Sequence, residues 1–129
     1  MGTTVLVESD IEKGKDVVRA LDEAGVKIRT ALWHFLSEAA EWRLVLATPI
    51  VDHDGPRAAY EAVRRVLAER GVDSPLLQIT LVSPRDPLIK QLRSAVTTPP
   101  GAIKDIRFTN NVVGNILIED AHIYRSCGP

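Results

Sequence analysis

Three adjacent residues, Asp52, His53 and Asp54, place two carboxylates beside an imidazole in the stretch LATPIVDHDGPRAAYEA. Such groups serve in proteins as metal ligands, as general acids or bases, or as polar groups at the start of a helix. Adjacent side chains rarely all point at one ion, and the sequence has no second cluster of His, Cys or Asp with ligand spacing. We therefore expect no metal site and no cofactor.

Two further polar stretches follow strand-like segments in the same way. SPRD, with Ser83 and Arg85, follows the apolar run PLLQITLV, and TNN, with Asn110, ends the next strand-like segment. If these strands are parallel, their carboxyl ends meet at one edge of the sheet, where ligands bind in open α/β folds. Two helices would begin there and direct amide donors toward an anion. The side chains expected around such an anion site are Asp52, His53, Asp54, Ser83, Arg85 and Asn110.

The alternative is that the aspartates only cap helices. Asp54 and Asp86 stand just before expected helices that have Pro56 and Pro87 in their first turns. Aspartate at that position satisfies free amide groups of the first turn, and proline suits the first helical residues. Capping accounts for both aspartates without a ligand, so the sequence leaves both interpretations open.

Nucleophilic catalysis has little support. The sequence contains neither a G-x-S-x-G elbow nor a phosphate-binding glycine loop. Cys127, the single cysteine, lies third from the end, where we expect nothing to hold a base beside it. We therefore predict no catalytic residue.

Three helices are expected from apolar residues at helical spacing and from their end signals. Their predicted ends are marked by Ser9 with Glu12 and Gly25, by Asp54 with Gly71, and by Asp86 with Pro87.

The remaining elements are predicted to be strands. VKIRTALWHFL and EWRLVLATPIV, joined by SEAA, predict a hairpin with Phe35 opposite Trp42 and Trp33 opposite Leu44. PLLQITLV predicts a central strand buried on both faces, because it lacks polar alternation. The last quarter of the chain is β-rich, with a tight turn expected at Asn110–Asn111.

The order of elements is thus helix, strand, strand, helix, strand, helix, strand, strand. It predicts a single α/β domain over residues 1–129, with α+β as the alternative class. Strand–helix–strand connections predict parallel neighbours and the hairpins predict antiparallel ones, so we expect a mixed, partly parallel sheet with helices packed on it.

Composition excludes several classes of function. The 129 residues are 45% hydrophobic and 26% charged, which is typical of a globular protein. Sixteen basic residues against seventeen acidic ones give a net charge of −1, so nucleic-acid binding through bulk charge is not expected. No apolar run approaches the roughly 20 residues that span a membrane. The start MGTTVLVESD is unlike a secretory signal, and with a single cysteine this indicates the cytoplasm.

Parts of the sequence resemble two groups of known proteins. TALWHFL followed by EWRLVLATP and DHDGPRAAYEA is similar to small uncharacterised bacterial α/β proteins over the first half of the chain, which implies no activity. The helix–strand–strand order also resembles the core of the restriction-endonuclease-like nucleases, whose second strand carries Glu-x-Lys. Here Glu41 is followed by Arg43 instead, so the resemblance implies at most an inactive relative.

We expect a non-catalytic cytoplasmic interaction or regulatory module that forms a homodimer or binds a protein partner. The segment NNVVGNILIEDAHIYRS comes last in the sequence, so we predict that it forms an edge strand that pairs with a second chain. The alternatives are a small enzyme or ligand-binding domain for an anionic molecule at the sheet edge of residues 52–54 and 83–86, and an inactive nuclease-like fold.

Overall fold

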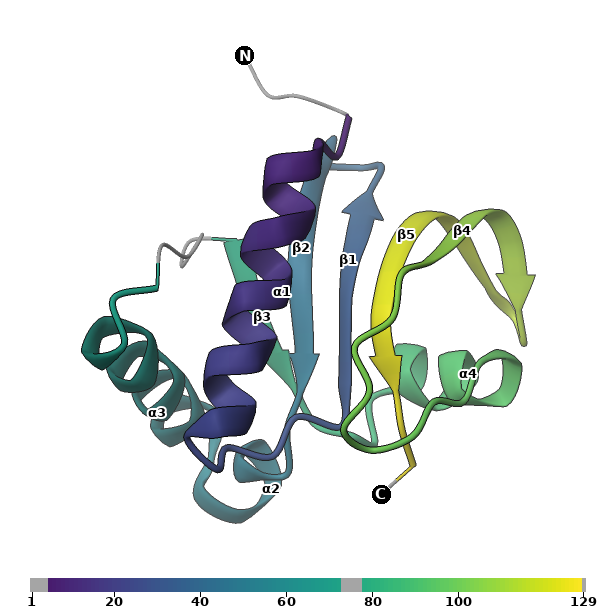
Figure 1. Cartoon of the computed structure of the whole chain (residues 1–129). Helices are drawn as coiled ribbons and strands as arrows, with labels where there is room; N and C mark the ends of the chain where they lie inside the picture. Colours follow the sequence, from purple (N-terminus) through teal and green to yellow (C-terminus); the bar gives the residue numbers. More distant parts are fainter. Residues whose placement is uncertain (1–4, 73–77, 129) are drawn as a thin grey trace.

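The computed structural model describes residues 5–72 and 78–128 of the chain. Its strands form one five-stranded mixed sheet in the order β3–β2–β1–β5–β4 (Figure 1). This confirms the predicted mixed, partly parallel sheet with helices packed on it, and the class is α+β, the alternative that the sequence left open. In chain order the elements are α1 (Glu8–Glu23), β1 (Thr30–Leu36), β2 (Glu41–Ala47), α2 (Ile50–Asp54), α3 (Pro56–Glu69), β3 (Ile79–Val82), α4 (Pro87–Ala95), β4 (Ile106–Val113) and β5 (Ile116–Ser126).

The first helix begins earlier than its sequence predicts. Ser9 lies inside α1 and does not cap it, whereas the Asp10 carboxylate accepts the Val7 amide at 3.4 Å. The predicted end is confirmed. Gly25 adopts a φ of +80°, and the Val26 amide donates at 2.9 Å to a carbonyl of the last turn. A glycine with this conformation followed by an apolar residue is a common way to end a helix.

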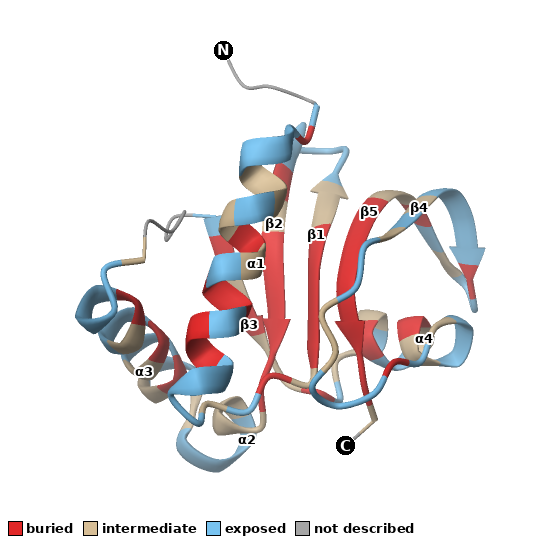
Figure 2. Ribbon diagram, in the orientation of Figure 1, coloured by how far each residue is buried: buried red, intermediate tan, exposed pale blue. Residues whose placement is uncertain are grey.

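The predicted β1–β2 hairpin is confirmed in its register. Phe35 lies opposite Trp42 and Trp33 opposite Leu44. The side chains of this sheet face pack against α1 and α3, and the sheet beneath them is buried (Figure 2). The main members of this core cluster are Val17, Val18, Leu21, Trp33, Trp42, Leu44, Leu46, Val63, Leu67 and Tyr124.

The opposite face of the sheet is covered by α4. Ile89 and Leu92 of this helix are fully buried against Leu32, Ile118 and Ile123 of the sheet. A helix on each side of the sheet gives the two apolar cores that a mixed α/β fold requires.

The strand β3 lies at an edge of the sheet, so its predicted central position is wrong. It pairs with β2 alone, and residues 75–77 of the predicted strand lie outside the described part. The Tyr60 hydroxyl accepts the Leu81 amide at 3.0 Å. This side chain from α3 thus covers a backbone donor of β3, and it is the neighbouring helix that buries the apolar run.

The last two strands form a hairpin whose turn differs from the predicted one. Val113 pairs with Ile116, so Gly114 and Asn115 close the turn, and Gly114 has a φ of +63°. Asn110 also has a positive φ, +51°, but it lies within β4. Both residue types tolerate this backbone conformation, which is why the sequence alone did not separate them.

The positive φ at Asn110 accompanies a bend of the hairpin. Ala121 and Ile118 are three residues apart in β5, yet both belong to the core beneath α4. In a regular strand they would face opposite sides. The hairpin therefore changes face along its length and arches toward α4 (Figure 1).

The final strand is not an edge. β5 lies between β1 and β4, and β4 is the outer strand. The predicted pairing of a last, uncovered strand with a second chain therefore rests on a wrong premise, because the hairpin covers β5 within the same chain.

Candidate functional site

Two parallel strands end at one edge of the sheet, as the sequence predicts. β2 and β3 are paired in parallel from Leu44 with Ile79 to Ala47 with Val82. The Thr48 amide continues the pairing by donating to the Val82 carbonyl at 3.0 Å. The residues that follow the two strands are therefore held side by side.

The segment Asp52-His53-Asp54 lies in a short helix, α2, that the sequence did not predict. Pro49 precedes α2 in a helical conformation, and the His53 amide donates to its carbonyl at 3.0 Å. Gly55 then ends α2 with a φ of 91°, and α3 begins at the next residue. Asp54 thus ends α2 and does not cap α3, so the capping interpretation is wrong for this aspartate.

Ser83 joins the two loops. Its hydroxyl donates to Asp52 Oδ2 at 2.9 Å and accepts the Arg85 amide at 3.0 Å. Asp86 Oδ1 accepts the Leu88 amide at 3.0 Å, so capping is confirmed for this second aspartate. The Ser83 contacts fix Asp52 relative to the start of α4.

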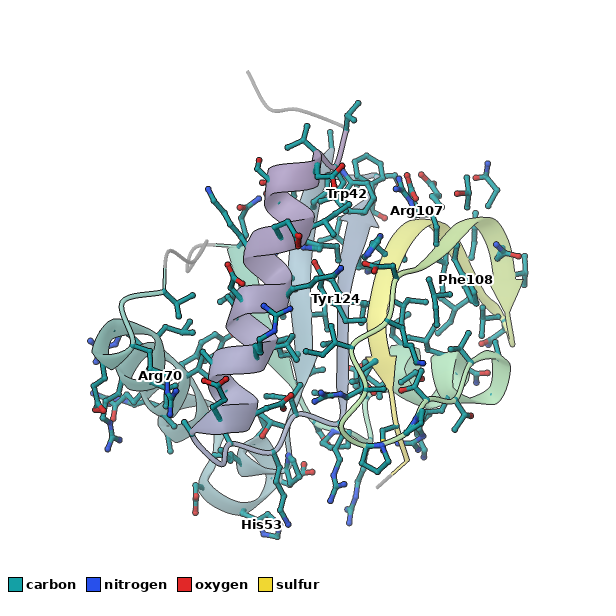
Figure 3. The ribbon with its side chains drawn as sticks, viewed as in Figure 1. Trp42, His53, Arg70, Arg107, Phe108 and Tyr124 are labelled. Atoms are coloured by element: carbon teal, nitrogen blue, oxygen red, sulfur yellow. The ribbon has the colours of Figure 1, made fainter. Side chains whose placement is uncertain are left out.

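A pocket of about 300 Å³ opens at this edge of the sheet. We call it the basic pocket, and its lining residues are Arg29, Pro49, Asp52, His53, Pro84, Arg85 and Arg93. Figure 3 shows His53 at this end of the molecule, on α2. Three arginines and one aspartate therefore border the same small volume.

Arg29 enters the pocket from the start of β1. Its amide donates to the Ala47 carbonyl at 2.8 Å, and its carbonyl accepts the Cys127 amide at 2.9 Å. Cys127 is buried, so this backbone hydrogen bond ties the end of β5 to the start of β1. Arg29 Nε is itself buried and has no hydrogen-bond partner among the described residues. Buried polar groups are nearly always paired, so this nitrogen is an unusual feature of the pocket.

The other two arginines come from the segment that starts and forms α4. Arg93 Nη1 donates to the Pro84 carbonyl at 3.2 Å, which directs the side chain toward the pocket. Arg85 is exposed. Within residues 5–72 and 78–128, no carboxylate lies within ion-pair distance of Arg29, Arg85 or Arg93.

The arrangement suits an anion. Guanidinium groups bind carboxylate or phosphate oxygens through two parallel hydrogen bonds. Like charges around one cavity repel one another, and an anion between them would remove that repulsion.

The structure brings together four of the six residues predicted for this site. Asp52, His53 and Arg85 line the pocket, and Ser83 is bonded to Asp52. Asp54 does not line it. Asn110 is absent from it as well, because β4 is antiparallel to β5, which runs in the direction of β2, so β4 runs opposite to β2 and β3. The assumption of three parallel strands is therefore wrong.

Arg29 and Arg93 were missed. The predicted hairpin register contained a signal for Arg29, because the start of β1 must lie beside the end of β2. Arg93 had no such signal, since the orientation of α4 on the sheet depends on packing.

A second polar cluster lies on the α1 side of the sheet. Asp105 accepts hydrogen bonds from Lys15 Nζ and pairs with His122 Nε2, both at 2.9 Å. The Lys15 hydrogen bond, more than that of His122, holds the pKa of the Asp105 carboxyl below its usual value. The cluster joins α1, β5 and the segment before β4, and none of the main pockets of the described chain adjoins it.

The tip of the first hairpin carries Arg43, His34 and Glu41. Arg43 Nε donates to Thr80 Oγ1 at 2.9 Å and Nη2 to the Ile79 carbonyl at 3.3 Å. Burial lowers the pKa of His34. These contacts tie β2 to β3, so this group supports the sheet.

Some classes of site find no support in the described residues. No group of three or more His, Cys, Asp or Glu side chains there could hold a metal ion. None of the helices, searched over the same residues, is long and apolar enough to cross a membrane.

Comparison with protein families, with curated proteins and with solved structures finds no match for this chain, so its function must be inferred from the geometry of the basic pocket and of its surface.

Proposed function

We propose that this protein is a non-catalytic binding module whose ligand is a small anionic molecule held in the basic pocket. The observation that supports this most is the convergence of Arg29, Arg85 and Arg93 on one small cavity without a carboxylate paired to any of them in the described chain. The one carboxylate in the lining, Asp52, is hydrogen-bonded to Ser83.

The position of the pocket also fits ligand binding. It lies where the parallel strands β2 and β3 end, the place at which α/β sheets usually bind their ligands. Its volume of about 300 Å³ is at the lower end of the roughly 300–1,000 Å³ that small-molecule sites occupy. A compact ligand with one acidic group is therefore the best match.

Catalysis is not part of the proposal. The Ser83 hydroxyl lies beside the pocket, where it donates to a carboxylate and accepts a hydrogen bond from a backbone amide. A serine nucleophile requires a general base such as histidine in hydrogen-bond contact, and no such contact to Ser83 is present among the described side chains.

The test is a thermal-unfolding titration with inorganic phosphate and sulfate. A ligand at ten times its Kd adds about 1.4 kcal/mol to the free energy of unfolding, which raises the Tm of a domain of this size by roughly 5 °C. Arg85→Ala should abolish this gain. Its effect on the unliganded Tm should be small, because Arg85 is exposed and its side chain forms no hydrogen bond or ion pair within the described chain that would be lost.

Arg57→Ala is the matched control. Arg57 is 94% exposed on α3 and lies outside the basic pocket. This variant should keep the full phosphate response. The proposal is wrong if neither anion raises the Tm of the wild type, or if Arg85→Ala responds to phosphate as the wild type does.

A second candidate function is self-association through the β4–β5 hairpin, with a second copy of the chain as the partner. Val112 and Leu117 form a cross-strand pair that is 69% and 55% exposed. Exposed apolar pairs of this kind mark contact surfaces more often than exposed single residues do. The free backbone of β4 adjoins them at the edge of the sheet.

Light scattering at micromolar to millimolar concentrations tests this candidate. We expect a dimer that Val112→Lys and Leu117→Lys convert to a monomer, whereas Val7→Lys, at an exposed valine before α1, leaves it intact. Ile118 is unsuitable for this purpose, because it is fully buried. A wild type that stays monomeric would rule the candidate out.

A further inference from the structure

Asp52 is the unusual member of the basic pocket. A carboxylate among arginines weakens the attraction for an anion, and it would repel an anionic ligand directly. It would normally pair with a guanidinium, yet no described arginine lies within ion-pair distance of it. Asp52 is exposed, so water satisfies its carboxylate in the unliganded protein, and a ligand in the pocket has to replace that water with a donor of its own.

The hydrogen bonds of Asp52 show which kind of group a ligand would have to offer it. Oδ2 accepts the Ser83 hydroxyl at 2.9 Å, whereas Oδ1 accepts a hydrogen bond from no described residue. A carboxylate has about four acceptor positions, so Asp52 retains free capacity toward the cavity that it lines. The Ser83 contact holds the carboxylate in place without using that capacity.

The net charge of the lining residues indicates which acidic group the ligand should carry. Three guanidinium groups and one carboxylate leave two positive charges around the cavity. A phosphomonoester carries about −1.5 to −2 at neutral pH and matches this balance, whereas a single carboxylate leaves it half compensated. The group that donates to Asp52 should be uncharged, such as a hydroxyl, because an ammonium group would change the net charge of the ligand and disturb this balance.

We propose that the ligand of the basic pocket is a phosphomonoester of a small hydroxylated molecule, with its phosphate on the arginines and a hydroxyl donated to Asp52. This inference rests on the proposed function, since it requires that the pocket bind an anion at all. It assigns Asp52 the role of a specificity residue that favours hydroxylated phosphate esters over plain ones.

The experiment compares two esters with the same three-carbon chain, glycerol 3-phosphate and propyl phosphate, with inorganic phosphate as a third probe. Isothermal titration should give the wild type about tenfold tighter binding of glycerol 3-phosphate than of propyl phosphate, the difference expected for a hydrogen bond to a charged acceptor. Asp52→Ala should reduce this preference to within about twofold.

The same variant should act in the opposite direction on the plain anions. Asp52→Ala removes a negative charge from the lining, so it should strengthen the binding of inorganic phosphate and propyl phosphate by a few fold. A merely structural role for Asp52 would weaken the binding of all three probes together. Asp54→Ala is the matched control, because this neighbouring carboxylate is exposed and lies outside the pocket.

The outcomes separate the two proposals. If none of the three probes binds, both the proposed function and this inference are wrong. If phosphate binds in an Arg85-dependent manner but the wild type does not distinguish the two esters, only the inference is wrong. A preference for glycerol 3-phosphate that survives Asp52→Ala, or that Asp54→Ala also removes, would likewise overturn it.

Discussion

Arg125 is a buried charged residue whose side chain links several elements of the fold. Its side chain is 1% exposed and forms two hydrogen bonds with Asp22, at 3.0 and 2.7 Å. It also donates to the carbonyls of Ile28 and Ala102, both at 2.9 Å. One side chain thus joins the end of α1, the start of β1, β5 and the segment that precedes β4.

We expect Arg125→Met to lower the free energy of unfolding by about 4 kcal/mol. Removing one partner of a buried ion pair costs about 3–5 kcal/mol, because the other charge remains without compensation. Asp22 is one-third exposed, which favours the lower half of this range, whereas the two carbonyls left without donors favour the upper half. For a domain of this size the change corresponds to a fall in Tm of roughly 15 °C.

Equilibrium unfolding in urea measures this change, with Arg107→Met as the control. Arg107 forms an equally short pair with Asp120, at 2.6 and 2.8 Å, but it is 46% exposed. It lies beside Trp42 at the other end of the sheet, 5.6 Å from the ring centroid (Figure 3). This variant should lose about 1 kcal/mol or less. If Arg125→Met lost no more than Arg107→Met, our view of Arg125 would be refuted.

Three further variants test local features by the same unfolding measurement. Gly14→Ala should lose about 1–3 kcal/mol, because a Cβ there would overlap the Tyr124 hydroxyl, which the core holds in place. Gly55→Ala should lose about 1–3 kcal/mol as well, since φ 91° and ψ 162° suit glycine alone. Because Lys15 holds the pKa of Asp105 below its usual value, the stability that Asp105 contributes is present at neutral pH and is lost below about pH 4. Asp105→Asn should therefore be less stable than the wild type at pH 7 and approach it below pH 4, and a constant difference between them would contradict this.

The signals that predicted the fold correctly were local. Gly25 and Gly71 adopt positive φ at the ends of α1 and α3, and Asp86 caps α4, because each effect depends on a few neighbouring residues. The register of the first hairpin was predictable because a four-residue turn and the aromatic pairing of Phe35 with Trp42 leave little freedom.

The errors concern the order of the strands, which local sequence does not determine. The apolar run that ends in β3 is buried by α3 and Tyr60 at an edge of the sheet, and the sequence cannot distinguish this from burial between two strands. Asn110 was predicted in the site for the same reason, because the sequence does not determine the direction of β4 in the sheet. α2 was missed because Ile50 and Val51 continue the apolar pattern of β2, although Pro49 already begins a helical turn.

The mixed sheet explains why Arg29 is part of the pocket. In a parallel sheet only the carboxyl ends of strands meet at the ligand-binding edge, but β1 is antiparallel to β2, so the start of β1 lies there too. This places Arg29 in the lining, while its Nε is buried without a hydrogen-bond partner in the described part of the chain. An unpaired buried polar group costs about 1–3 kcal/mol, so Arg29 is expected to lower the stability of the unliganded protein.

Arg29→Met separates this cost from a structural role. Methionine keeps the apolar stem of the side chain and removes the unpaired nitrogen, so the free energy of unfolding without ligand should be unchanged or higher by up to about 1 kcal/mol. The gain in Tm with phosphate should be lost, because one of the three guanidinium groups is gone. A loss of more than about 1 kcal/mol without ligand would identify Arg29 as a structural side chain, since a structural role predicts destabilisation of this size. A retained phosphate response would show that the anion binds elsewhere. Stability and binding should thus change in opposite directions at Arg29, as expected of a residue whose cost is offset only when the pocket is occupied.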